Sequence, residues 1–307
     1  MKQTYDVVIA GAGPAGLSAG IYTGRALLKT LVLEKGMPGG QILLTDIIEN
    51  YPGFPEAVSS FSLAEGFKSQ ALKFGCEIIQ DEIKKIEKTG NIWTVTTLEK
   101  EFSARGLIIA TGSSHRKLDV HGERQFTGKG VSYCATCDGA FFRDKVIAVV
   151  GGGSYALTEA LFLTRFAKKV IVIHRRNQFR AEKVLLARAK DNEKIEFMLD
   201  SVVREIKGEQ KVGSAKILNK INKKESEIEI EGIFVSVGMV PNTDIVKGLV
   251  DLNDKGEIIV TKNMATSEQG IFAAGDVTDA CSNQVATAVG AGVEAGLAVN
   301  KYIEEDK

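Results

Sequence analysis

DVVIAGAGPAG, residues 6–16, is the stretch that decides the fold of this 307-residue chain. Its apolar first half is typical of a buried parallel strand, and its glycines follow at the spacing GxGxxG. Gly11 permits a tight turn, Gly13 lets the backbone approach a pyrophosphate, and Gly16 allows close packing of a helix on the strand. The stretch therefore predicts a strand, a phosphate-binding turn and the start of a helix.

The residues after this turn complete a nucleotide-binding unit. An apolar helical pattern runs from Leu17 through Leu27, and residues 30–33 form a second predicted strand. Glu34 ends that strand, 23 residues after Gly11. A carboxylate about 20 residues after the first glycine is expected to bind a ribose hydroxyl. With both strands and the acid in place, we interpret the unit as a dinucleotide site rather than a structural glycine turn.

The same pattern repeats further along the chain. A predicted strand over 145–150 leads into the turn 151–156, then a helical pattern and a strand over 169–173. His174 follows where the first unit has its acid, and arginines come next. Arginines bind a 2′-phosphate by charge-assisted hydrogen bonds, whereas a carboxylate would repel it. We expect NADPH here in preference to NADH, the alternative being a solvated basic turn. The expected NADPH residues are Gly151, Gly153, Ser154, His174, Arg175, Arg176 and Arg180.

Two cysteines stand just before the second unit, in the stretch Cys134-Ala135-Thr136-Cys137-Asp138. Cysteines at this spacing can cycle between dithiol and disulfide. A structural zinc site usually needs a second pair or two histidines at ligand spacing. Cys76 and Cys281 stand alone, and the three histidines form no such pair. We therefore expect redox chemistry and no metal.

Asp138 follows the second of these cysteines. Two compatible roles fit an aspartate at this place. It can exchange a proton with the nearby sulfurs, or it can cap a helix that begins after the cysteines.

Composition excludes several classes of function. The chain is 44% hydrophobic and 25% charged, which is ordinary for a soluble globular protein. Lys plus Arg equals Asp plus Glu at 39 each, so no net field favours nucleic acid or an anionic membrane. The N-terminus lacks a signal peptide's apolar region, and no apolar run reaches the roughly 18 residues of a membrane span. We expect a soluble, cytoplasmic protein.

The end of the chain is expected to return to the first nucleotide-binding unit. Asp276 follows an apolar run, at the carboxyl end of a predicted strand, and a long helical pattern begins at Gln284. Glycine-containing loops near 110–114 and 238–242 suggest two hinge-like crossings. Two dinucleotide sites in one chain suggest a resident flavin and a diffusing electron donor. The predicted fold is α/β, with two Rossmann-like dinucleotide-binding domains and the NADPH domain inserted into the FAD domain. The expected spans are 1–113 and 244–307 for FAD and 114–243 for NADPH.

Across essentially the whole chain, the sequence resembles the bacterial low-molecular-weight thioredoxin reductases. The motifs that carry this resemblance are Gly11–Gly16, Gly39-Gly40-Gln41, Glu49–Gly53, Ala110-Thr111-Gly112, Cys134–Gly139, His174-Arg175-Arg176 with Arg180-Ala181, and Ala274-Gly275-Asp276.

This resemblance implies a homodimeric enzyme that moves electrons from NADPH through FAD and a CxxC disulfide to thioredoxin. It implies that Cys137 lies nearest the flavin, that Cys134 attacks the partner's disulfide, and that Asp138 handles the proton. The implied FAD residues are Gly11, Gly13, Pro14, Ala15, Gly16, Glu34, Lys35, Gly39, Gly40, Gln41, Asn50, Thr111, Gly112, Asp276, Gln284, Val285 and Ala286.

The chain departs from the family pattern at three places. Ser154-Tyr155 replaces a small or acidic pair, Thr158 replaces a glutamate before Glu159, and Asn283 replaces a basic residue. The first two bear on NADPH binding, and the third bears on the flavin potential.

Three alternatives to thioredoxin reduction remain open. The same chemistry could serve a glutaredoxin-like or peroxiredoxin-system partner. A ferredoxin or flavodoxin NADP reductase shares the fold but lacks the CxxC pair. A flavin- or zinc-binding sensor would not be an enzyme at all.

Overall fold

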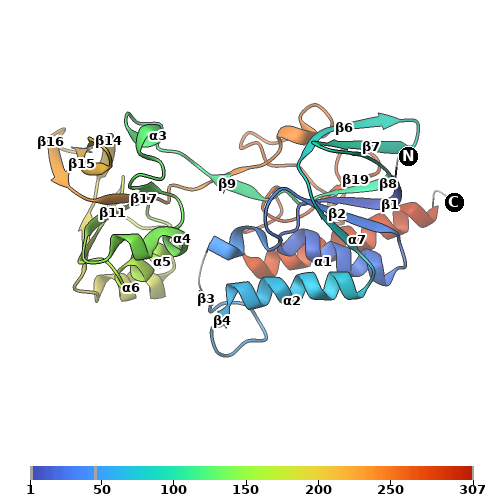
Figure 1. The fold of residues 1–307 in the computed structure, drawn as a ribbon, viewed down its shortest axis with the longest axis horizontal. Helices are drawn as coiled ribbons and strands as arrows, with labels where there is room; N and C mark the ends of the chain where they lie inside the picture. The colour runs from blue at the N-terminus through green and yellow to red at the C-terminus, as the bar shows by residue number, and fades with distance from the viewer. Residues whose placement is uncertain (1–2, 45–46, 306–307) are drawn as a thin grey trace. The chain divides into compact units, whose positions relative to one another are not determined.

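The computed structural model describes residues 3–44 and 47–305 (Figure 1). These residues form two compact units. The first comprises the described parts of 1–114 and 240–307, and the second comprises 115–239. The second unit is therefore inserted into the chain of the first.

The inserted unit ends earlier than the sequence suggested. The sequence predicted an end at Thr243, but the side chains of Asn242 and Thr243 bond within the first unit. The Asn242 amide donates to the carbonyl of Thr111 at 2.9 Å, and the Thr243 hydroxyl donates to the carbonyl of Gly256 at 3.1 Å. The second unit consequently ends at Met239.

The first unit is built on one mixed sheet. Its parallel part contains β5 (Glu77–Gln80), β2 (Thr30–Glu34), β1 (Gln3–Ala10), β8 (Glu101–Ile109) and β19 (Ile271–Ala273). The antiparallel strands β7 (Ile92–Thr97) and β6 (Ile83–Thr89) extend it beyond β8. Ala10 pairs with Leu33 and with Ile109, and Ile109 pairs with Ala273. The segments that follow β1, β2, β8 and β19 therefore leave the sheet at the same edge, where parallel sheets bind ligands.

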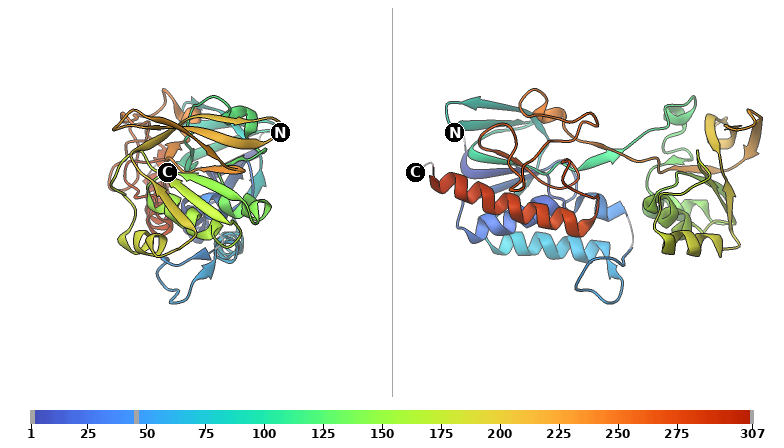
Figure 2. Two further views of the ribbon diagram at one scale, coloured as in Figure 1. Left: turned by 90° about the vertical axis from the view of Figure 1, so that its left-hand side faces the viewer. Right: turned by 180° about the vertical axis from the view of Figure 1, so that it is seen from behind.

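Three helices cover one face of this sheet, α1 (Pro14–Arg25), α2 (Ser60–Lys73) and α7 (Val285–Glu305) (Figures 1 and 2). In α7 the buried residues recur every three or four positions, as an amphipathic helix requires. Gly292 and Gly296 lie on this stripe and face α1. A Cβ at Gly292 would lie 2.1 Å from the carbonyl oxygen of Ala15. The two helices therefore pack backbone against backbone.

Replacing Gly292 with Ala is expected to destabilise the protein by about 1–3 kcal/mol, because the helices must separate to admit the methyl group. The matched control is Gly290→Ala in the same helix, where an added Cβ meets nothing within 4 Å. Alanine there should stabilise the helix by up to about 1 kcal/mol. Urea unfolding of both holoproteins measures the difference. Equal stability of the two variants would show that the close approach is not needed.

The predicted helix over Leu17 to Leu27 is too long. The helix α1 ends at Arg25, and Leu27 adopts a left-handed φ of 61° with its side chain 93% exposed. The N–H of Leu28 donates to the carbonyl of Thr23 at 3.1 Å, which turns the chain back toward β2.

The second unit has a parallel sheet in the order β10 (Val131–Ser132), β17 (Gly232–Val235), β11 (Val146–Val150), β12 (Lys169–Ile173) and β13 (Ile195–Met198). The helices α5 (Ser154–Leu163) and α6 (Lys183–Lys190) pack on one face. The other face contacts an antiparallel meander of β14 (Ser201–Gly208), β15 (Val212–Asn219) and β16 (Glu225–Glu229). Both faces are closed by apolar cores, so the predicted Rossmann-like architecture is confirmed.

The two crossings between the units form a two-stranded ribbon. β9 (Ser113–His115) pairs with β18 (Met239–Pro241). The N–H of Arg116 donates to the carbonyl of Gly238, and the N–H of Asn242 donates to the carbonyl of Gly112, both at 2.9 Å. The sequence suggested two separate loops here, and the structure pairs them instead.

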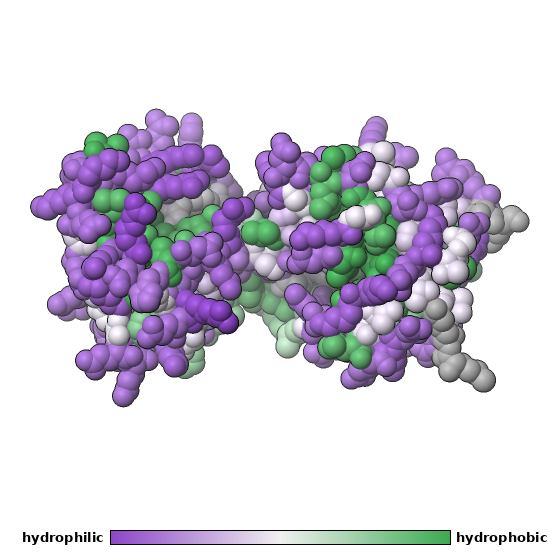
Figure 3. Space-filling view, turned by 90° about the horizontal axis from the view of Figure 1, so that it is seen from above, coloured by the Kyte–Doolittle hydropathy of each residue, from purple (hydrophilic) through white to green (hydrophobic). Residues whose placement is uncertain are grey.

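The short elements complete the description. They are η1 (Gly40–Leu44), β3 (Ile47–Ile48), β4 (Val58–Ser59), α3 (Glu123–Phe126), α4 (Ala135–Asp138), η2 (Gly139–Phe142) and η3 (Asp244–Val246). The face drawn in Figure 3 is largely hydrophilic in both units, with smaller apolar patches among the hydrophilic residues. Within the described residues, no helix has the length and apolar character to cross a membrane.

Candidate active site

The redox pair predicted from the sequence is a disulfide in the second unit. Cys134 and Cys137 are bonded, with their Cα atoms 5.4 Å apart. Cys134 is the N-cap of α4, and its Sγ accepts the N–H of Cys137 at 3.1 Å. The N–H of Cys134 itself donates to Ser132 Oγ at 3.1 Å. A short turn, the redox turn of residues 132–138, therefore presents both sulfurs, and Cys137 is exposed.

The N–H group beside Cys134 bears on its chemistry after reduction. A backbone donor at a helix N-terminus stabilises a thiolate by hydrogen bonding. Cys137 is exposed and Cys134 is half-buried, and the role of each sulfur in disulfide exchange stays a prediction.

One of the two roles considered for Asp138 is wrong. The cap of α4 is Cys134, one turn earlier. Asp138 precedes η2, but among the described residues its side chain makes no capping hydrogen bond there. The helix begins directly after the first cysteine, and the Cys134 sulfur accepts the N–H that a capping aspartate would take. The proton-transfer role of Asp138 stays a prediction.

The first glycine turn has the geometry of a phosphate-binding turn. Gly11 adopts φ of 106°, and a Cβ there would lie 2.3 Å from the carbonyl oxygen of Ala110. A Cβ at Gly16 would lie 1.9 Å from the carbonyl oxygen of Gly11. No other residue fits either position, and the turn leads directly into the N-terminus of α1.

The carboxylates of Glu34 and Asp276 flank this turn and differ in their hydrogen bonding. Glu34 accepts the N–H of Ala12 at 2.8 Å through one oxygen and the N–H of Gly36 at 2.9 Å through the other. Each oxygen keeps a lone pair for a ribose hydroxyl. Asp276 Oδ1 is buried without a hydrogen-bond partner among the described residues, and burial raises its pKa. A buried acceptor of this kind fits a ligand that brings donors, such as the hydroxyl groups of FAD.

Several predicted FAD residues meet at this edge of the sheet. The N–H of Gly39 donates to the carbonyl of Ala12 at 2.8 Å, and a Cβ at Gly40 would lie 3.0 Å from Gly13 Cα. Asn50 donates to Gln284 at 3.0 Å. Of the remaining predicted residues, Pro14 and Ala15 begin α1, Lys35 follows β2, Gln41 lies in η1, Thr111 and Gly112 follow β8, and Val285 and Ala286 begin α7. The residues present fit FAD.

The second glycine turn is built around a histidine. A Cβ at Gly152 would lie 2.2 Å from the ring of His174. That ring is buried, stacks on Phe179 with centroids 5.1 Å apart, and lies 3.0 Å from the carbonyl oxygen of Gln178. The N–H of Arg180 donates to the carbonyl of Gly152 at 2.9 Å. His174 therefore shapes the loop from inside.

The three arginines of this loop differ from His174 in exposure. Arg175, Arg176 and Arg180 are all exposed, close to the turn that ends in Gly153 and Ser154. The helix α5 begins at Ser154, and no side chain of the described residues caps its N-terminus, which is the kind of site that binds phosphate. The residues present fit a dinucleotide with an additional phosphate.

Comparisons with known proteins agree with this geometry. Residues 5–295 match the family model for pyridine nucleotide-disulphide oxidoreductases. The chain belongs to this family. It is 44% identical over 305 residues to the thioredoxin reductase of Bacillus subtilis, which covers 99% of this chain and 96% of the relative. It is 45% identical to the thioredoxin reductase of Listeria monocytogenes, over 100% of this chain and 96% of the relative.

Solved structures of pyridine nucleotide-disulphide oxidoreductases match as well. The thioredoxin reductase of Lactococcus lactis has a TM-score of 0.96 at 43% identity, covering 98% of this chain and 99% of that one. The enzyme from T. acidophilum has a TM-score of 0.94 at 34% identity and covers both chains fully. The resemblance to thioredoxin reductases is therefore confirmed, and the chain is an oxidoreductase whose cofactors are FAD and NADPH.

Sequence reasoning missed one residue of this oxidoreductase, the buried acid Glu159 in α5. Its carboxylate accepts the N–H of Ala135 at 2.9 Å and a close hydrogen bond from the hydroxyl of Ser236. The hydroxyl of Tyr155 bonds to it as well. Burial raises the pKa of Glu159 to about 7. The available signal was a single acid within the apolar helical stretch Ala156–Leu163.

The raised pKa of Glu159 predicts a pH dependence of stability. Burial raises it from 4.5 to about 7, so the folded protein holds a proton that the unfolded chain releases in this window. The free energy of unfolding should therefore fall as pH rises from about 4.5 to about 7, by up to about 1.4 kcal/mol per pH unit. Glu159→Gln removes this contribution. Urea unfolding of both proteins across the window isolates it, and a difference that does not vary with pH would contradict the assignment.

Proposed function

We propose that this enzyme is a thioredoxin-disulfide reductase, which passes electrons from NADPH through FAD and the Cys134–Cys137 disulfide to oxidised thioredoxin. The observation that carries the proposal is a CxxC disulfide on the same unit as an arginine-lined nucleotide turn. The full-length similarity to thioredoxin reductases supports it.

The cysteines carry out the disulfide exchange. The FAD held by the first unit would supply the two electrons, which come from NADPH. Two electrons and one proton convert the Cys134–Cys137 disulfide into one thiolate and one thiol. Cys134 as thiolate attacks the partner's disulfide and forms a mixed disulfide, expelling one partner thiolate. Cys137 as thiolate then attacks Cys134, which restores the disulfide and releases the second partner sulfur. Asp138, beside Cys137, exchanges the proton that this sequence requires.

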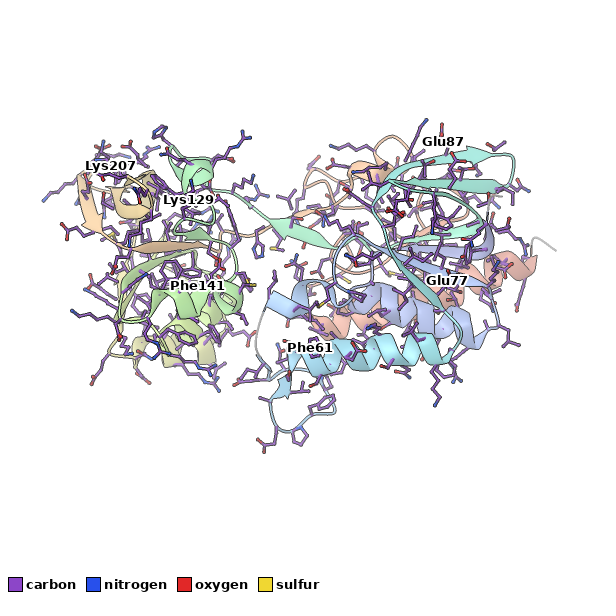
Figure 4. All side chains as sticks on the ribbon, viewed as in Figure 1. Phe61, Glu77, Glu87, Lys129, Phe141 and Lys207 are labelled. Carbon is purple, nitrogen blue, oxygen red and sulfur yellow. A yellow bond between two sulfur atoms is a disulfide. The ribbon has the colours of Figure 1, made fainter. Side chains whose placement is uncertain are left out.

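The surroundings of the disulfide suit a protein substrate. Phe141 follows the redox turn in η2 and is 73% exposed (Figure 4). An exposed aromatic side chain four positions after the exposed Cys137 is a suitable anchor for a protein partner. A small disulfide would not need such an anchor.

The position of the two sites in the chain requires motion. The disulfide and the NADPH turn lie in the second unit, whereas the FAD residues lie in the first. Both must reach one flavin, so we expect the units to turn about the ribbon of β9 and β18 during the cycle. Gly112 and Gly238 flank this ribbon with φ of 63° and 114°.

The proposal extends to a homodimer, as the resemblance implies, and to a cytoplasmic location, as expected from the sequence. Light scattering of the purified holoenzyme tests the assembly, since a monomer at working concentration would exclude it.

A purified yellow protein tests the function directly. NADPH should bleach the flavin, and adding the host's oxidised thioredoxin with a disulfide dye should give continuous colour. Bleaching without thioredoxin turnover would instead favour a glutaredoxin-like or peroxiredoxin-system partner. A protein that holds no flavin would exclude the enzyme altogether.

A further inference from the structure

One buried carboxylate joins three parts of the second unit. Glu159 is 3% exposed and accepts hydrogen bonds from Ala135, Ser236 and Tyr155. Ala135 directly follows Cys134, Ser236 directly follows β17, and Tyr155 lies in the first turn of α5, next to the NADPH turn. The carboxylate therefore connects the redox turn with the end of β17 and the start of α5.

The hydrogen bond between the N–H of Ala135 and Glu159 ties the redox turn to a residue outside the turn. Ser132 bonds the N–H and the carbonyl of Cys134, which are local contacts within the turn. The acceptor of the Ala135 N–H is Glu159, which lies in α5, 24 residues away in sequence. Ala135 is 1% exposed, so water cannot replace the carboxylate as the acceptor of its N–H if the carboxylate is removed. Loss of Glu159 would leave the peptide next to Cys134 free to rotate toward another acceptor.

Tyr155 and Ser236 hold the Glu159 carboxylate in place by hydrogen bonds of their own. The Tyr155 ring packs against His115 with centroids 5.5 Å apart, and its hydroxyl reaches Glu159. The carbonyl oxygen of Ser236 touches the NADPH turn, since a Cβ at Gly151 would lie 2.2 Å from it. The bulky tyrosine that departs from the family pattern therefore has a place in this network.

We propose that Glu159 is a positioning residue that fixes the backbone beside Cys134, so that its sulfur stays aimed for exchange with the partner's disulfide. The inference rests on the proposed function, because it assigns Glu159 to the disulfide-exchange half of the cycle. The role requires a hydrogen-bond acceptor of this length and does not require a charge.

The test compares Glu159→Leu, which removes the acceptor, with Glu159→Gln, which keeps an oxygen for the N–H of Ala135. Glu193→Leu, at an exposed position of the same unit, is the matched control. Turnover of each holoenzyme is measured with thioredoxin. The second readout is the alkylation rate of Cys134 by iodoacetamide after reduction, resolved by mass spectrometry.

Glu159→Leu should lower kcat roughly tenfold or more and slow alkylation of Cys134, while the KM for thioredoxin stays within about twofold. Glu159→Gln should stay within about threefold of the wild type in both readouts. Wild-type values for Glu159→Leu would overturn the proposal. Equal impairment of Glu159→Gln and Glu159→Leu would also overturn it and assign the role to the charge or the proton instead.

If Glu159→Leu does not fold with its flavin, Ser236→Ala tests the positioning role of Glu159 instead. Losing the hydroxyl frees the carboxylate to move, so kcat and the alkylation rate should fall roughly threefold. Unchanged values in Ser236→Ala would then overturn the proposal. Alkylation needs no thioredoxin, so a changed rate in an enzyme that fails with thioredoxin would separate this inference from the proposed function.

Discussion

Replacing Cys134 or Cys137 with Ser is expected to reduce thioredoxin turnover to the background rate. A complete exchange needs both sulfurs, because one attacks the partner's disulfide and the other then resolves the mixed disulfide and releases the partner. Flavin content and bleaching by NADPH should stay normal, since both cysteines lie outside the two glycine turns. Steady-state turnover and a flavin absorbance trace measure the two halves separately.

Cys76→Ser is the matched control for this result. Cys76 is buried in the first unit, where its sulfur lies 2.9 Å from the carbonyl oxygen of Gly20, and serine can keep that hydrogen bond. Its turnover should remain normal. Cys137→Ser should also trap a mixed disulfide between Cys134 and a thioredoxin that lacks its resolving cysteine. A stable mixed disulfide at Cys137 in the reciprocal variant Cys134→Ser would reverse the assigned order of attack.

Loss of the arginines in the NADPH turn should give the second large effect. Replacing Arg175, Arg176 or Arg180 with Ala should raise the KM for NADPH roughly ten- to hundredfold and leave NADH use nearly unchanged. Each lost charge-assisted hydrogen bond to the 2′-phosphate is worth about 1.5–3 kcal/mol. Initial rates with NADPH and with NADH, at saturating thioredoxin, give the KM for each nicotinamide and show whether only NADPH is affected.

Lys190→Ala controls for a general loss of positive charge, because Lys190 is exposed at the end of α6, outside the turn. Its KM for NADPH should match that of the wild type. Equal losses with NADPH and NADH in the arginine variants would show that these side chains hold the loop together rather than bind the phosphate. His174 provides a contrast, since its buried ring fills the space below Gly152 and its loss should impair both nicotinamides.

The parts of the fold that depend on local patterns could be predicted from sequence. Both glycine turns with their strands were found because backbone sterics require glycine there, as at Gly11 and Gly16. The helix predicted to reach Leu27 was too long, because apolar periodicity alone does not show where the backbone turns left-handed. The pairing of β9 with β18 was missed because neither short strand has a periodic pattern of its own.

The candidate site likewise contains residues that could be predicted from sequence and one that could not. The two cysteines lie only three positions apart in sequence, so a redox pair could be predicted. Glu159 could not be placed, because its partners Ala135 and Ser236 lie 24 and 77 residues away and only the folded sheet brings them together. The raised pKa of its carboxyl comes from burial, which a sequence does not reveal for a single acid.

The central claim is that electrons from NADPH leave this enzyme through Cys134 and Cys137 to thioredoxin. The most direct test is NADPH oxidation by the holoenzyme with the oxidised thioredoxin of the same organism as the only acceptor. We expect saturable oxidation of one NADPH for each thioredoxin disulfide reduced, and none when Cys134 or Cys137 is replaced. Flavin bleaching without thioredoxin-dependent oxidation, or turnover that survives without the cysteine pair, would contradict the claim.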